Sequence, residues 1–224
     1  MKLFVVLLLA VGASAEIVST VNQKFKTQTN TDLKDQIVRE LQAGYFYDAY
    51  SHYFARADVA LYGFAKFFAA AAKEERTHAE KMMEYINKRG GEVELGDIKL
   101  QDVCLAVSQL LQASTLTTEK SAACICYFMS RDVENVDAQC GLRKDWFSGL
   151  MAMEDTLMLE RYVNQQLLDI HERNDGDPHF SHTMEHEFLD EQVDSIKKIG
   201  DMVTQLRRAG KDLGEYIFDE KLNA

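Results

Sequence analysis

The chain lacks the sequence pattern of a β protein. No stretch alternates apolar and polar residues as a half-buried strand does, whereas apolar residues recur every three or four positions over most of the length. Proline occurs once, as Pro178 directly after Asp177, which is a favoured start for a helix. We therefore predict an all-α fold, and 224 residues with 46% hydrophobic content are enough to bury the core of a single domain.

Positive charge and long hydrophobic runs are also scarce. The 25 lysines and arginines face 36 aspartates and glutamates, which gives a formal net charge of −11. This excess argues against nucleic acid and against an anionic membrane as partners, and it suits the handling of cations. Beyond the first residues no apolar run is long enough to cross a bilayer, so we expect no membrane insertion.

Residues 1–15 have the features of a secretory signal peptide. Lys2 supplies the charged start, residues 3–11 form an apolar run, and Ala13-Ser14-Ala15 resembles a cleavage site. A buried N-terminal helix or strand is the alternative. The signal predicts a secreted protein whose mature domain covers residues 16–224.

Cysteines are absent from every segment with helical periodicity. The four of them lie in one stretch, residues 101–143, as Cys104, Cys124, Cys126 and Cys140. In an oxidising compartment they would form local disulfides, with three possible connectivities. A cysteine–metal site is the alternative, although the spacing of Cys124 and Cys126 is one residue short of the usual zinc pattern.

Helical periodicity predicts four long helices and one short one. The predicted helices cover about residues 30–57, 59–88, 145–173, 178–209 and 213–221. Asn30-Thr31-Asp32 offers capping residues for the first helix, and Asp145 offers one for the third. The connection between the second and third helices is long, and residues 103–111 are apolar enough for a short helix of their own.

Polar residues interrupt the apolar seam on each long helix. They are Glu40 and Tyr47 on the first, Glu75 and His78 with Glu74 beside them on the second, Glu160 on the third, and Gln192 on the fourth. Any one of them alone fits a hydrogen-bonded polar core. Several carboxylates cannot share a dry interior without cations, however, and Glu-x-x-His on a helix is a spacing that binds metals in helix bundles. Oxygen ligands with one imidazole suit iron or manganese, and zinc remains possible.

These residues lie in stretches that resemble ferritin. The stretches are Arg39-Glu40-Leu41, Tyr45-Phe46-Tyr47, Phe64-Ala65-Lys66-Phe67-Phe68, Glu74 to Lys81, Lys88-Arg89-Gly90-Gly91, Asp97-Ile98-Lys99, Ala152-Met153-Glu154, Asp177-Pro178-His179, Glu191-Gln192-Val193 and Glu215 to Asp219. The resemblance covers most of residues 33–219 outside the cysteine-bearing insertion. It implies a ferritin-like four-helix bundle with one long crossover and a short fifth C-terminal helix. It also implies a hollow shell of 24 subunits, either all alike or mixed with other ferritin subunits.

The resemblance assigns a role to each polar seam residue. Glu40, Glu75 and His78 match the ligands of one iron, and Glu74 and Glu160 those of a second, with Glu75 bridging. Tyr47 and Gln192 match residues that support the site. Because the light-type subunits lose several of these residues, the chain resembles a heavy-type ferroxidase subunit that oxidises Fe(II) with dioxygen and stores ferric mineral. A carrier shell with little ferroxidase activity is the alternative within the fold.

The chain departs from the usual ferritin pattern at two places. Lys73 and Thr77 reduce the carboxylates expected on the inner surface, which predicts weaker mineral nucleation. His182 and Glu185 match the threefold pore, where an Asp and a Glu are usual.

The signal-like start and the insertion resemble secreted, yolk-type ferritins of molluscs. This implies storage in yolk granules and an outward insertion that a receptor could bind. A secreted helical signalling protein is the alternative from another class, and it gives no reason for seam carboxylates to converge.

Overall fold

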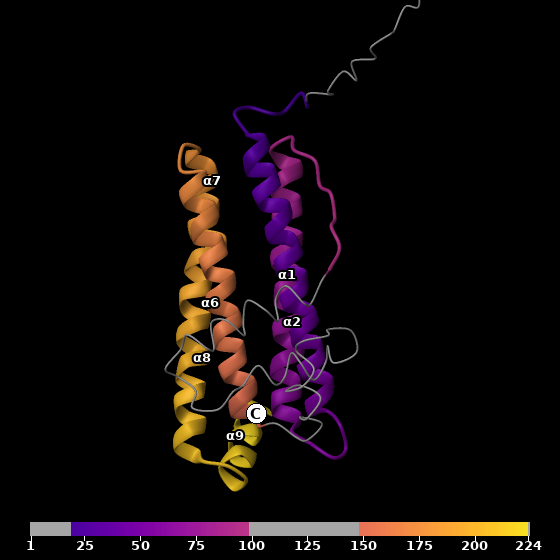
Figure 1. The fold of residues 1–224 in the computed structure, drawn as a ribbon, viewed down its shortest axis with the longest axis vertical. Coiled ribbons are helices and arrows are strands. Elements are labelled where there is room, and N and C mark those ends of the chain that lie inside the picture. Colours follow the sequence, from indigo (N-terminus) through magenta and orange to yellow (C-terminus); the bar gives the residue numbers. More distant parts are fainter. Residues whose placement is uncertain (1–18, 99–147, 224) are drawn as a thin grey trace, which may run out of the picture.

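The computed structural model describes residues 19–98 and 148–223, and within these ranges every regular element is helical. Two long antiparallel helices, α1 (Thr27–Phe54) and α2 (Tyr62–Lys88), pack along one another (Figure 1). The second pair consists of α6 (Gly149–Arg173) and a rod formed by α7 (Pro178–Met184), the π-helix η1 (Glu185–Leu189) and α8 (Asp190–Ala209). A short helix, α9 (Leu213–Asn223), follows. None of the described helices is both long and apolar enough to cross a bilayer.

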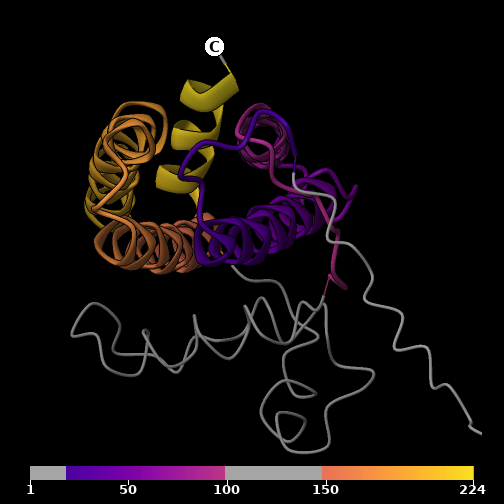
Figure 2. The same ribbon diagram turned by 90° about the horizontal axis from the view of Figure 1, so that it is seen from above.

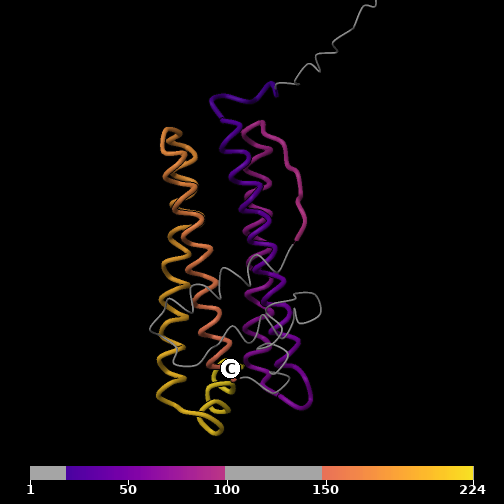
Figure 3. Tube along the Cα trace, in the orientation of Figure 1, coloured from indigo at the N-terminus to yellow at the C-terminus, as the bar shows by residue number. Residues whose placement is uncertain are grey.

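The order of the helices requires one long crossover. The chain leaves α2 at one end of the bundle, and α6 begins at the other end (Figures 1 and 3). The first part of this connection runs back beside α1, where Glu94 pairs with Lys34 at 2.7 Å. The predicted ferritin-like bundle with a crossover and a short last helix is confirmed. The signal segment 1–15, the insertion 101–143 with its cysteines, and Asp145 lie outside the described residues.

The predicted caps of the first helix are wrong, because α1 begins at Thr27 after Lys26, three residues earlier. The side chains that suggested a cap are used by distant parts of the chain instead. Asn30 accepts from the backbone of Glu92 at 3.2 Å and donates back to it at 3.1 Å. Asp32 accepts from Asn174 at 2.9 Å. The predicted start of the second helix is also wrong, because α2 begins at Tyr62, three residues later than predicted.

The fourth predicted helix is interrupted by a π-helical turn. Asp177 caps its start as predicted, accepting from the backbone of His179 and Phe180 at 3.2 Å. Residues Glu185–Leu189 then form η1, which widens the helix locally. The predicted seam residues Phe188 and Gln192 are nevertheless both buried.

Helix α9 closes one end of the bundle and caps two other helices. Seen along the bundle, it lies between the α1–α2 pair and the α6–α8 pair (Figure 2). Glu215 accepts from the backbone N–H of Gly149 at 2.5 Å, and Asp219 accepts from that of Phe64 at 2.8 Å. Both carboxylates therefore satisfy N–H groups in the first turns of α6 and α2. A side chain at Gly63 would overlap the Asp219 carbonyl, so this close approach requires glycine.

The predicted apolar side of α9 is only partly buried. Phe218 is buried, but Leu213, Tyr216 and Ile217 remain exposed on the single chain. Carboxylates, rather than a full apolar face, hold this helix to the bundle.

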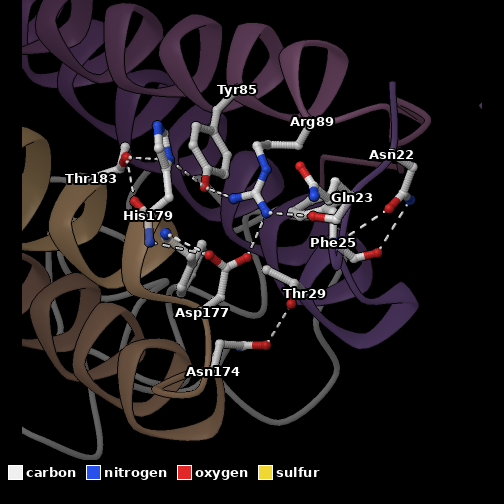
Figure 4. Close-up of polar contacts among 11 residues, drawn as sticks. Asn22, Gln23, Phe25, Thr29, Tyr85, Arg89, Asn174, Asp177, His179 and Thr183 are labelled. Atoms are coloured by element: carbon white, nitrogen blue, oxygen red, sulfur yellow. Dashed lines mark hydrogen bonds and ion pairs between the residues drawn. The ribbon is translucent and has the colours of Figure 1, made fainter. Parts of the chain in front are cut away.

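A second polar network joins the helices at the opposite end (Figure 4). Arg89 donates to Asp177 at 2.6 Å, to the Tyr85 hydroxyl at 2.5 Å and to the backbone of Gln23 at 3.5 Å. The Tyr85 hydroxyl also lies 3.2 Å from His179 Nδ1. The network therefore links the N-terminal segment, the end of α2 and the start of α7.

Candidate metal centre

Three side chains from two helices meet in the middle of the bundle. Glu40 comes from α1, and Glu75 and His78 come from successive turns of α2. Each offers a ligand atom that lies within 4.8 Å of the others, and all three are buried. The helical period of about 3.6 residues places Glu75 and His78 on one face, and close packing of α1 on α2 brings Glu40 to that face. The structure thus brings together the three residues predicted for the first metal.

Few hydrogen-bond donors reach these carboxylates. Gln36 donates to Glu40 Oε1 at 2.7 Å, whereas the other oxygen, Oε2, is buried without a hydrogen-bond partner in the described part of the chain. Glu75 Oε2 lies 3.4 Å from His78 Nδ1. A buried carboxylate oxygen without a donor is unfavourable, and a cation bound there would remove that cost.

Glu160 is held beside this group by the two predicted supporting residues. It is buried on α6 and accepts hydrogen bonds from the Tyr47 hydroxyl and, at 2.9 Å, from Gln192 Nε2. The amide oxygen of Gln192 is buried and has no hydrogen-bond partner among the described residues. Tyr47 and Gln192 therefore fix the orientation of Glu160 and leave one polar atom available to a small molecule.

Glu74 lies at the edge of the site rather than inside it. It is exposed, and its carboxylate faces that of Glu191, which the sequence did not lead us to single out. Glu191 Oε2 lies 3.1 Å from His78 Nε2. Glu191 precedes Gln192 and follows Phe188 by three residues, a helical spacing that could have identified it from the sequence. The site therefore contains one more carboxylate than predicted.

Electrostatics at the centre oppose the ionised carboxylates. Burial raises the pKa of Glu40 well above its usual value, and the charge of Glu75 raises it further. Burial and then the charge of Glu160 do the same to the pKa of Glu75. Burial raises the pKa of Glu160 despite its bonds to Tyr47 and Gln192, and it raises the pKa of Glu74, which also faces Glu191. Oxygen donors with one imidazole fit iron or manganese, which would supply the missing positive charge.

The predicted pore residues lie together on the outside of the single chain. The His182 ring centroid is 4.3 Å from that of His186, and Glu185 Oε1 is 3.0 Å from His171 Nε2. A threefold pore requires three subunits, so the role of His182 and Glu185 there stays a prediction.

Fold and site together define a helical-bundle protein with a buried, carboxylate-rich group that could hold a metal ion. The ferritin-like domain family matches residues 30–209. Yolk ferritin of Lymnaea stagnalis is 47% identical over 197 residues, which cover 86% of this chain and 82% of that protein. Soma ferritin of the same species is 39% identical over 206 residues, which cover 91% and 95%. The chain belongs to the ferritin family, and these relationships support a role in iron storage.

Proposed function

We propose that the chain is a ferroxidase subunit of a hollow iron-storage shell. It would oxidise Fe(II) to Fe(III) with dioxygen, and the shell of 24 subunits would hold the ferric mineral. The observation that carries the proposal is the convergence of Glu40, Glu75 and His78, buried and short of hydrogen-bond donors. A set of negative groups that is unfavourable without a cation is a good binding site for one.

The proposed ligands divide into two overlapping sets. Glu40, Glu75 and His78 would bind one iron, and Glu74, Glu75 and Glu160 the second, with Glu75 shared. Carboxylate oxygens favour Fe(III) over Fe(II), which supplies a driving force for oxidation, and two neighbouring irons can deliver electrons to dioxygen in pairs.

Gln192 and Tyr47 would act on the surroundings of the irons. The free amide oxygen of Gln192 can accept a hydrogen bond from a bound water, since its Nε2 is already used by Glu160. The Tyr47 hydroxyl keeps Glu160 oriented, and burial raises the pKa of Tyr47 well above its usual value, so the phenol keeps its proton.

The chain's surface supports assembly, and its similarity to a yolk ferritin supports secretion. Exposed Leu213, Tyr216 and Ile217 on α9 give it an apolar face that a neighbouring subunit would bury. The 47% identity to a yolk ferritin favours a secreted shell stored in yolk, built of identical or mixed subunits, whose insertion 101–143 could meet a receptor.

A second candidate is a carrier shell with little ferroxidase activity of its own. Lys73 and Thr77, both exposed on α2 beside Glu74, favour it, because they place a cation and a neutral group where inner-surface carboxylates were expected. Under this alternative the centre binds Fe(II) but oxidises it slowly.

The decisive experiment is anaerobic addition of Fe(II) followed by dioxygen, monitored by absorbance. We expect rapid oxidation in the parent and its loss in the double variant Glu75→Gln, His78→Gln. Glu84→Gln, which changes an exposed carboxylate on the same helix, is the matched control and should oxidise iron at the parental rate. The parental rate in the double variant would refute the assignment, and slow oxidation in the parent itself would favour the carrier shell.

A further inference from the structure

A second buried phenol–carboxylate pair lies close to the metal centre. Tyr50, one helical turn after Tyr47 on α1, donates its hydroxyl to Asp155 on α6 at 2.8 Å. Both residues are completely buried, with 0% exposure. The pair resembles Tyr47 with Glu160, but neither Tyr50 nor Asp155 belongs to the proposed iron ligands. It therefore needs an explanation of its own.

Two aromatic rings connect Tyr50 with Tyr47. The ring centroid of Phe46 is 5.6 Å from that of Tyr47 and 4.8 Å from that of Tyr50. Phe68 stacks on both, at 6.0 Å from Tyr47 and 4.9 Å from Tyr50. Since Tyr47 is hydrogen-bonded to Glu160, a continuous series of ring contacts runs from the metal centre to Tyr50. Electron transfer falls steeply with distance, so this closeness matters.

Packing alone does not account for Asp155. Burying a carboxylate costs free energy, and two apolar residues of similar size would fill the same space without that cost. A buried carboxylate beside a phenol has one chemical ability that an apolar pair lacks. It can accept the phenol proton when the ring loses an electron, and an oxidised phenol in a dry interior needs such an acceptor.

We propose that Tyr50 is a redox relay that gives one electron towards the metal centre while Asp155 takes its proton. The inference rests on the proposed ferroxidase function. The oxidant is hydrogen peroxide, the product that remains when two Fe(II) ions have given dioxygen two electrons. Its reduction to two waters needs two electrons and two protons.

The step balances as follows. One electron comes from Tyr50 and one from a further Fe(II), and solvent supplies the two protons that complete the waters. At Tyr50 the phenol O–H bond breaks, an O–H bond forms on Asp155, and a neutral tyrosyl radical remains. A second Fe(II) then reduces the radical, and the proton returns from Asp155. The net reaction consumes one peroxide and two Fe(II), with Tyr50 and Asp155 restored.

The relay would protect the shell's interior from peroxide. The test compares Tyr50→Phe, which keeps the ring and removes only the hydroxyl, with Asp155→Asn, which keeps the shape and removes the proton acceptor. Tyr53→Phe is the matched control, since Tyr53 is a buried tyrosine one turn further along α1. After Fe(II) and dioxygen are mixed, both relay variants should release severalfold more hydrogen peroxide per iron oxidised, and the control should match the parent.

The EPR signal of the tyrosyl radical distinguishes a redox role from a packing defect. Rapid-freeze EPR of the parent should show a tyrosyl signal that narrows with ring-deuterated tyrosine, and that is lost in Tyr50→Phe and in Asp155→Asn. Restoring the carboxylate as Asp155→Glu should restore part of it. An unchanged signal and unchanged peroxide release in both relay variants would overturn the proposal even if the parent oxidises iron rapidly.

A second arm keeps the proposal testable if the parent oxidises iron slowly. The iron-free protein is oxidised by photogenerated ruthenium(III), and the EPR signals of parent, Tyr50→Phe and Tyr53→Phe are compared. Exposed tyrosines such as Tyr45 and Tyr62 contribute equally to all three. A component lost only in Tyr50→Phe supports the relay, and its absence from the parent refutes it.

Discussion

Carboxylates at the centre of the bundle and at its end are held in opposite ways. At the end, Asp177 pairs with Arg89, and Asp32 accepts from Asn174 and Arg173. Burial alone would raise the pKa of each, but these donors outweigh it, and the pKa of both aspartates lies below the usual value. At the centre, burial and repulsion raise the pKa of Glu40 and Glu75.

The difference separates structural carboxylates from ligands. A buried carboxylate that meets enough donors joins helices, whereas one that meets other carboxylates needs a cation from outside. Replacing a carboxylate at the centre should therefore lower activity and spare stability, and breaking a pair at the end should lower stability and spare activity.

The largest effect is expected at the centre, on activity. Glu40→Gln should slow the rapid phase of iron oxidation by about 100-fold, because it removes an iron ligand. The thermal stability of the iron-free protein should stay the same or rise, since one repelling charge is gone. Stopped-flow absorbance and calorimetry measure the two quantities. A variant that melts well below the parent would show that Glu40 is structural, and the comparison would fail.

The reverse result is expected at the end of the bundle. Arg89→Ala should lower the free energy of unfolding by about 3 kcal/mol, because it leaves the partly buried carboxylate of Asp177 without its ion-pair partner. Iron oxidation per folded subunit should be unchanged. Denaturant unfolding is compared with Arg56→Ala, which removes the exposed pair with Asp58 and should change stability by less than about 0.5 kcal/mol. Equal losses in the two variants would contradict the prediction.

Removing the cap that α9 supplies to α2 should have a smaller effect on stability. Asp219→Ala takes away the acceptor for the first turn of α2 and should cost about 1–2 kcal/mol. Tyr216→Ala, an exposed change on the same helix, serves as the control for assembly effects, and both are measured by calorimetry and sedimentation. No loss of stability in Asp219→Ala would show that solvent replaces the cap.

The smallest effect is expected on the stability contributed by Asp32 at acid pH. Because the pKa of Asp32 is lower in the folded protein than the ordinary 3.8, its contribution is present above that pH and fades as pH falls through the lowered folded value. Asp32→Asn should therefore be less stable than the parent at neutral pH, with the gap narrowing below about pH 3.8. Melting temperature against pH tests this. A constant gap would mean that Asp32 acts through shape rather than charge.

The candidate site could be read from the sequence because helical periodicity fixes which residues share a face. Glu40, Glu75, His78 and Glu160 each fell on an apolar seam, and packing of the seams brought them together. Glu191 was missed because the seam was traced through Phe188 and Gln192, although Glu191 also follows Phe188 by a helical spacing of three residues.

The helix ends were harder to predict because their partners are distant in sequence. Asn30 and Asp32 have the chemistry of caps, yet they bond Glu92 and Asn174, and α2 takes its acceptor from Asp219, 155 residues after Phe64. Capping rules consider the nearest few residues, and here long-range contacts override them.

The caps supplied by α9 also determine when the subunit can be completed during synthesis. Asp219 and Glu215 are synthesised after α2 and α6, yet they satisfy the first turns of both helices. Helices α1 and α2 can pair while translation continues, because domains form from the N-terminal side at the pace of elongation. The first turn of α2 stays without this acceptor until α9 has been synthesised. Closure of this end of the bundle by α9 therefore follows the pairing of α1 with α2.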